Sequence, residues 1–154
     1  MPDDYLASLS TQQRAGVFRD RIQQLPSKQA IFVALDQDDV VGFGVSGPTR
    51  ESELGTDGEI FAINIVNAAK RKGLGLRLMN AMAEGLVHSG FAGAGLWVIE
   101  ENAPARRFYE VLGGREAMKK DQQFGDRTLV ELGYVWPSAS ALLSRTTELV
   151  RQRG

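Results

Sequence analysis

Runs of apolar residues, separated by polar turns, divide the chain into short segments typical of strands. Residues 29–35 are apolar and β-branched, and residues 40–48 repeat that pattern after a polar turn, so together they predict a hairpin of two strands. Residues 58–66 are apolar almost throughout, which predicts a strand in the middle of a sheet. Further strands are predicted at residues 94–99, 116–123 and 127–136, the last two as a hairpin.

Other segments carry apolar residues at helical spacing. Ser10 and Gln13 form a capping-box pattern before such a run, and Pro26 ends it, so a helix is predicted over residues 10–25. Similar patterns predict three more helices, over residues 74–89, over residues 104–112 and from residue 138 onward.

The order of these elements predicts a mixed α/β (α+β) fold in three layers. The chain has 154 residues, 43% of them hydrophobic, which suits a single domain with its own core. We expect an N-terminal helix at residues 10–25, a central core at about residues 58–114, and a C-terminal hairpin and tail at residues 115–154. Neither a repeat nor a low-complexity linker divides the sequence.

Composition and charge exclude several classes of protein. A formal net charge of −1 does not favour a general nucleic-acid binder. The absence of cysteine removes disulfides, thiolate metal sites and a cysteine nucleophile, and the single histidine leaves no predicted metal site. No apolar run reaches the ~18 residues of a membrane span, and the first residues lack a signal-peptide pattern. We therefore expect a cytoplasmic protein without a membrane partner.

One glycine pattern is misleading. Gly42, Gly44 and Gly47 satisfy G-x-G-x-x-G, which in dinucleotide-binding folds lies between a strand and a helix. Here the glycines lie inside the predicted strand and Pro48 follows them, so a bulge or close packing is the better interpretation. A dinucleotide-binding dehydrogenase is therefore disfavoured.

A second glycine pattern lies between a predicted strand and a predicted helix. Residues 70–75 read Lys-Arg-Lys-Gly-Leu-Gly, and the helix follows at once. The first amides of a helix and flexible glycines can hold a phosphate, and the cations add charge. A solvated basic turn explains this segment alone equally well.

Residues 102–113 change that balance, because they read N-x-x-A-x-x-F-Y-x-x-x-G. With Lys70-x-x-Gly73-x-Gly75 before it, this segment resembles the GCN5-related N-acetyltransferase (GNAT) superfamily over about residues 30–136. Lys70 stands where the family most often has Gln or Arg, and it keeps a cationic donor. Asn67 stands where many members have Pro.

The resemblance implies a central, mostly antiparallel sheet with a parallel splay, flanked by helices. It also implies direct transfer of an acetyl group from acetyl-CoA, as co-substrate, to a primary amine, without a metal. Tyr109 matches the family's acid near the CoA sulfur, and Glu59 matches a frequent base that acts through water. Glu53, Asp57 or water itself remain alternatives for the base.

The resemblance also implies which residues bind the cofactor. Backbone groups of Ile65 and Val66 would pair with the pantetheine arm. Backbone N–H groups from Arg71 to Leu76 would hold the pyrophosphate, and Lys70 to Lys72 would supply charge. Asn102 would bind pantetheine, cap the following helix, or do both. The predicted cofactor-binding residues are Ile65, Val66, Lys70, Arg71, Lys72, Gly73, Leu74, Gly75, Leu76 and Asn102.

Some features of the protein stay open at this stage. The acceptor can be a small molecule, which we favour, or a protein amine, and the family allows a homodimer. A catalytically inactive sensor or interaction module of the same fold, which binds CoA or acyl-CoA, is the alternative function, and an enzyme of this fold that uses a longer acyl-CoA is a further alternative. His88 is expected to complement a helix dipole. Trp97 and Trp136 are expected to pack, with the edge of the acceptor pocket as the alternative for Trp136. Arg106 and Arg107 are expected to form a solvated helix face, with contact to the CoA 3′-phosphate as the alternative.

Overall fold

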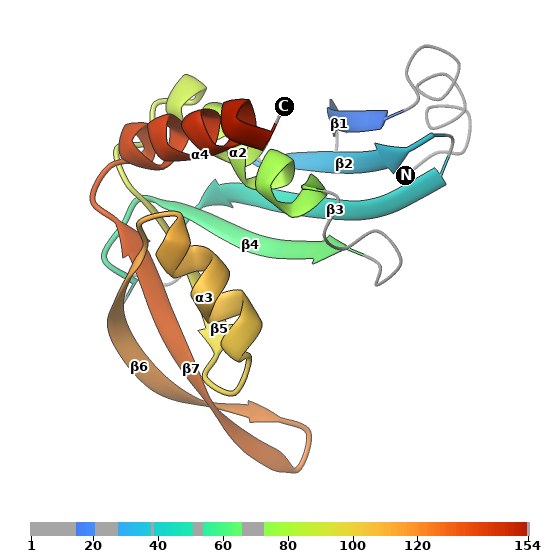
Figure 1. The fold of residues 1–154 in the computed structure, drawn as a ribbon. Coiled ribbons are helices and arrows are strands. Elements are labelled where there is room, and N and C mark those ends of the chain that lie inside the picture. Colours follow the sequence, from blue (N-terminus) through green and yellow to red (C-terminus); the bar gives the residue numbers. More distant parts are fainter. Residues whose placement is uncertain (1–14, 21–27, 38, 51–53, 66–72, 154) are drawn as a thin grey trace.

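The computed structural model describes residues 15–20, 28–37, 39–50, 54–65 and 73–153 of the chain. These residues form one seven-stranded sheet in the order β1-β2-β3-β4-β5-β7-β6, with helices packed beside it (Figure 1). The strands are β1 (Ala15–Asp20), β2 (Ala30–Asp36), β3 (Asp39–Pro48), β4 (Gly58–Ile65), β5 (Ala94–Ile99), β6 (Arg115–Phe124) and β7 (Arg127–Trp136). The helices are α2 (Leu74–His88), α3 (Ala103–Val111) and α4 (Ala139–Arg153).

The sheet is antiparallel except between β4 and β5, where the strands run parallel. These two strands pair at a single position, Glu59 with Gly95, and then diverge. Figure 1 shows the result as two groups of strands, β1–β4 and β5–β7, that open away from each other. The mixed α/β fold class, with a mostly antiparallel sheet and one parallel splay, is therefore confirmed.

A bulge in β4 sets which side chains face the helices. Val45 of β3 pairs with Ala62 and its neighbour Ser46 pairs with Ile60, so Phe61 is an extra residue. An extra residue reverses the alternation of side chains. Ile60 before the bulge and Ile63 after it therefore both pack on the core beneath α2.

The helix predicted over residues 10–25 is wrong where the structure describes it. Residues 15–20 form β1, which pairs with β2 along its whole length, from Ala15–Asp36 to Asp20–Ile31. The free edge of β2 offers a ladder of backbone hydrogen bonds that a short amphipathic helix cannot use. Residues 10–14 and 21–25 of that prediction lie outside the described residues.

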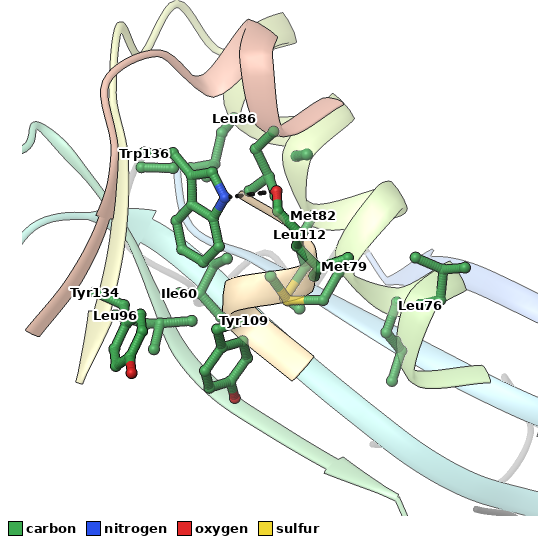
Figure 2. Close-up of a cluster of buried hydrophobic side chains, with 14 of the residues drawn as sticks. Ile60, Leu76, Met79, Met82, Leu86, Leu96, Tyr109, Leu112, Tyr134 and Trp136 are labelled. Atoms are coloured by element: carbon green, nitrogen blue, oxygen red, sulfur yellow. Dashed lines mark hydrogen bonds between the residues drawn. The ribbon is translucent and has the colours of Figure 1, made fainter. Parts of the chain in front are cut away.

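Gly44 of β3 lets α2 lie close to the sheet. A Cβ at Gly44 would come within 2.7 Å of Met82 Sδ, so a larger residue would push the helix away. Gly42, Gly44 and Gly47 all lie inside β3, which confirms that they form no strand-to-helix turn. On the other half of the core, Trp136 is 1% exposed and donates its indole N–H to Leu112 O at 3.0 Å (Figure 2).

Helix α4 is fastened to α2 and α3. Asn80 of α2 donates to the hydroxyl oxygens of Thr146, at 3.0 Å, and Thr147, at 2.9 Å. Arg145 donates to Val111 O, at the end of α3, over 3.1 Å. Figure 1 shows α2 and α4 side by side as a result. None of the described helices has the length and apolar character that crossing a membrane requires.

Candidate active site

A cavity of about 810 Å³ opens where β4 and β5 separate. Its walls come from the end of β4, the beginning of α2, one side of α3 and the last turns of α4. A volume of this size lies within the range of roughly 300–1,000 Å³ found for small-molecule sites. The described residues that line it are Ile63, Asn64, Ile65, Gly73, Gly75, Leu76, Asn102, Pro104, Ala105, Phe108, Tyr109, Val111, Leu112, Leu149, Gln152 and Arg153.

The beginning of α2 lies at one end of this lining. Gly73, its N-cap, has φ 80°, and no side chain caps the helix. The first helical hydrogen bond runs from Arg77 N–H to Gly73 O at 3.1 Å. The amides of residues 74–76 therefore have no intrahelical acceptor. They carry the positive end of the helix dipole, which suits an anion.

The predicted cofactor residues divide into three groups. Five of them line the cavity, namely Ile65, Gly73, Gly75, Leu76 and Asn102. The side chain of Leu74 is 5% exposed and belongs to the core, so only its backbone amide is available to a ligand. Val66, Lys70, Arg71 and Lys72 lie outside the described residues.

Tyr109 faces the cavity from α3 and is 6% exposed. Its ring lies 5.6 Å from that of Phe108 and 6.4 Å, edge-on, from that of Trp136. Burial raises the pKa of the Tyr109 phenol to about 12. Among the described residues no protein group is hydrogen-bonded to its hydroxyl. The phenol therefore stays protonated at neutral pH and can donate a proton or a hydrogen bond into the cavity.

Tyr134 of β7 gives a contrast, although its ring lies only 6.1 Å from that of Tyr109. Its hydroxyl donates to Glu110 Oε2 at 2.5 Å and accepts from Arg106 Nε at 3.3 Å. The pKa of Tyr134 is raised, first by burial and then by the bond to Glu110. Arg106 also donates to Glu100 O at 3.2 Å, so the prediction of a solvated Arg106 is wrong. Arg106 instead ties α3 to the sheet.

Glu59 lies outside the cavity lining, at the paired end of β4. It is 1% exposed, and alternation from Ile60 places it on the sheet face opposite the core beneath α2. Its Oε1 accepts from Arg50 N–H at 3.0 Å, and its Oε2 accepts from Arg50 Nη2 at 3.1 Å. The Arg50 side chain is 61% exposed and lies over the ring of Phe61. The carboxylate is thus buried and held by a cation that is open to solvent.

The hydrogen bonds of Asp57 make it a poor candidate for the base, although the sequence left it as an alternative. Its two oxygens accept from the amides of Ala92, at 2.9 Å, and Gly93, at 2.8 Å. These bonds, the one from Ala92 first, lower the pKa of the Asp57 carboxyl. Asp57 therefore fastens the loop before β5 to the start of β4. Glu53, the other alternative, lies outside the described residues.

The structure also bears on three secondary predictions, those for Asn102, His88 and Trp97. Asn102 Oδ1 accepts from Ala105 N–H at 3.2 Å, so Asn102 caps α3 while it lines the cavity. His88 is the last residue of α2, where it complements the dipole. Trp97 lies under the Lys120 ammonium, 4.0 Å from the ring centre. Within the described residues, no group of three or more His, Asp or Glu side chains could hold a metal ion.

The contribution of α4 to the cavity was missed by sequence reasoning. Leu149, Gln152 and Arg153 come from a tail in which only an amphipathic pattern was recognised. That pattern predicts a helix but not the element it packs on. The only available signal was the spacing of Leu142, Leu149 and Arg153 on one face of the helix.

Comparison with known proteins agrees with this geometry. The family model for FR47-like proteins matches residues 51–123. A relative from Bacillus subtilis (strain 168), the uncharacterized N-acetyltransferase YuaI, is 34% identical over 143 residues, which cover 92% of this chain and 79% of the relative.

Two solved structures share the fold. The ribosomal-protein-S18-alanine N-acetyltransferase from Escherichia coli has a TM-score of 0.63 at 21% identity, over 90% of this chain and 90% of that chain. A GNAT family acetyltransferase from Elizabethkingia anophelis with acetyl-CoA bound has a TM-score of 0.62 at 9% identity, over 81% of this chain and 99% of that chain. Because the Bacillus relative matches along most of both chains, the chain belongs to the GCN5-related N-acetyltransferase superfamily and is an acyltransferase.

Proposed function

We propose that this protein transfers an acetyl group from acetyl-CoA directly to a primary amine, and that the acceptor is a small molecule. The observation that carries the proposal is the cavity at the splay of β4 and β5, which runs from the uncapped start of α2 to Tyr109. Acetyl-CoA is an elongated molecule with phosphates at one end and a thioester at the other. The YuaI relative and the acetyl-CoA-bound neighbour support this choice of donor.

The cavity offers a suitable partner for each part of such a donor. The pyrophosphate would lie at the amides of residues 74–76, where Gly73 allows close approach. The pantetheine arm would lie along the end of β4, whose Ile65 lies beyond the single pair that joins β4 to β5. No described strand pairs with that edge of β4 beyond Glu59, so its backbone N–H and C=O groups can pair with the amides of the arm. The apolar lining around Phe108 suits the rest of the arm.

The chemistry requires one bond to form and one to break. The amine nitrogen attacks the thioester carbonyl carbon, the carbon–sulfur bond breaks, and the amine loses one proton while the sulfur gains one. Tyr109 would supply the proton to sulfur from its buried hydroxyl. The absence of cysteine in the chain is consistent with transfer without a thiol-bound intermediate.

Glu59 is the proposed base, acting through water from the opposite face of the sheet. It forms an ion pair with Arg50 at 3.1 Å, and Arg50 is exposed enough to give way to a cationic amine. Glu59→Gln should lower turnover and remove the loss of rate at low pH, measured as a kcat/KM profile against pH. Arg50→Gln is the matched variant, because it opens the pair and leaves the carboxylate. If the low-pH loss persists in Glu59→Gln, then water or Glu53 is the base.

The direct test mixes the protein with acetyl-CoA and a panel of small amines, with N-terminal peptides as a second panel, and follows the release of CoA thiol. Release that depends on a small amine supports the proposal. Release only with peptides would replace the small-molecule acceptor with a protein amine. CoA binding without release across both panels would contradict transfer.

A cytoplasmic location, a homodimer, and the absence of nucleic-acid and membrane partners remain predictions. Cell fractionation tests the cytoplasmic location and the absence of a membrane partner, because both predict that the protein is found in the soluble cytoplasmic fraction. Sedimentation of the purified chain tests the dimer. Binding to labelled DNA and RNA at low salt tests the expected lack of nucleic-acid affinity.

A further inference from the structure

Helix α4 ends at the cofactor cavity with a charged side chain. Arg153 is the single charged residue among the described residues that line the cavity. Its guanidinium lies against the turn before α2, because a Cβ built on Gly73 would come within 2.6 Å of Arg153 Nε and 3.2 Å of Nη2. Because Gly73 has no Cβ, it leaves room for the guanidinium and can also adopt a left-handed backbone conformation.

We infer that Arg153 is a phosphate-binding residue of the acyl-CoA site, supplied by the last helix rather than by the loop. This inference rests on the proposed function. Acyl-CoA brings a pyrophosphate and a 3′-phosphate, and a guanidinium forms paired, charge-assisted hydrogen bonds to phosphate oxygens. The amides at the start of α2 contribute partial charges only, so Arg153 adds a full positive charge at the same end of the cavity.

The packing of α4 fixes where this charge lies. Leu142 and Thr146 are both 0% exposed and face α2, and Leu149 and Arg153 continue the same face by one and two further turns. Asn80 holds Thr146 and Thr147, while Arg145 is bonded to the end of α3. A helix anchored along two sides places its last turn reproducibly. The charge is thus set in advance, which lowers the entropic cost of binding.

Arg151 provides a matched control. It carries the same charge in the same last turn of α4, is exposed, and does not line the cavity. Both arginines complement the dipole of α4, and Arg153 in addition lies against the turn before α2. A difference in CoA affinity between Arg153→Gln and Arg151→Gln, at equal thermal stability, therefore reports contact with the ligand.

The experiment measures calorimetric affinity of the full chain for CoA and for 3′-dephospho-CoA, and KM for acetyl-pantetheine, which has no phosphate. We expect Arg153→Gln to weaken CoA binding about tenfold and to flatten its salt dependence, with partial rescue in Arg153→Lys and little change in Arg151→Gln. Thermal unfolding should confirm that each variant is folded.

The two phosphate ligands locate the contact. A loss for CoA and 3′-dephospho-CoA alike places Arg153 on the pyrophosphate, and a loss for CoA alone places it on the 3′-phosphate. Unchanged CoA affinity in Arg153→Gln would overturn the inference. A rise in KM for acetyl-pantetheine as large as the loss of CoA affinity would also overturn it. Failure of the wild-type chain to bind CoA would instead count against the proposed function.

Discussion

The parallel strands β4 and β5 are each followed by a helix, and the two helices begin in different ways. At the start of α3, Ala103 N–H donates to Glu101 O, Pro104 has no N–H, and Asn102 Oδ1 accepts from Ala105 N–H. The next amide, that of Arg106, already makes a helical bond. Every amide of that first turn is accounted for within the chain. At the start of α2, a glycine with φ 80° stands in the N-cap position, and no side chain caps the helix.

This difference separates the two walls of the cavity by role. The α2 wall leaves backbone donors for an anion, so it is suited to binding. The α3 wall has no unpaired amide in its first turn, and it presents Tyr109 to the cavity further along the helix. It is therefore suited to the reaction. Changes on the α2 wall should therefore alter CoA affinity, and changes on the α3 wall should alter turnover or stability.

The largest effect is expected at the open turn. Gly73→Asp would place a carboxylate beside the amides of α2 and force a residue with a Cβ into a left-handed backbone. We expect CoA affinity to fall by about 100-fold or more, since a charged contact is lost and repulsion is added. Calorimetry measures the loss. Gly125→Asp is the control, because Gly125 has φ 64° in open space, at the turn between β6 and β7. If the two variants bind CoA with equal affinity, the anionic part of CoA does not bind at the α2 turn.

A smaller effect, on rate, is expected on the α3 wall. Tyr109→Phe removes the hydroxyl and keeps the ring, so turnover should fall about 20-fold, less than the roughly 100-fold or more typical of acid catalysis because a thiolate leaves readily. CoA affinity should change less than twofold. Since burial raises the pKa of Tyr109 to about 12, the wild-type rate should show no alkaline loss from this phenol below about pH 11.

Tyr134→Phe is the matched control for that rate. Its hydroxyl lies on the Arg106–Glu110 network instead of facing the cavity, so its loss should lower stability and spare turnover. Turnover that falls equally in both variants would assign the effect to packing. Turnover unchanged in Tyr109→Phe would place the acid elsewhere.

Most of the fold could be predicted because its elements are marked locally. Residues 94–99 form the expected strand, and α2 and α3 begin within a residue or two of the expected position, where Gly73 and Pro104 mark the turns. Residues 15–20 were assigned wrongly because the capping-box pattern and the apolar spacing of residues 10–25 favour a helix. Pairing with β2, which no local pattern shows, decided the outcome.

The same distinction between local patterns and long-range contacts applies to the residues of the cavity. The position of Tyr109 and Asn102 at the cavity could be predicted because a motif fixes their place on and before one helix, while their roles stay predictions. Arg153 was not found, since only the docking of α4 on α2, through Asn80 and Thr146, brings it to Gly73. The role of Arg106 was misjudged for a related reason, because its partner Tyr134 lies 28 residues away in sequence.

A third prediction tests the closed turn. Asn102→Ala removes the cap of α3, which should lower the free energy of unfolding by about 1 kcal/mol and the melting temperature by about 3 °C. CoA affinity should change much less than in Gly73→Asp. Asn102→Asp keeps an acceptor for Ala105 N–H and should retain the stability. If Asn102→Ala weakens CoA binding strongly while Asn102→Asp does not, Asn102 binds the ligand as well as capping α3.

The smallest effect is expected at the paired end of the two strands, which Asp57 fastens through Ala92 and Gly93. Its pKa is lowered in the folded state, so its stabilisation is complete above the unfolded-state value of about 3.9. That stabilisation is lost as the pH falls below 3.9, through the folded-state pKa. Asp57→Asn should cost less than about 1 kcal/mol at neutral pH, because Asp57 is exposed, and should make stability less dependent on pH in that window. Urea unfolding at pH 7 and pH 3 measures this, with Asp126→Asn, at the distant β6–β7 turn, as the control. Equal pH dependence in wild type and Asp57→Asn would show that the splay is held by the Glu59–Gly95 pairing and the core alone.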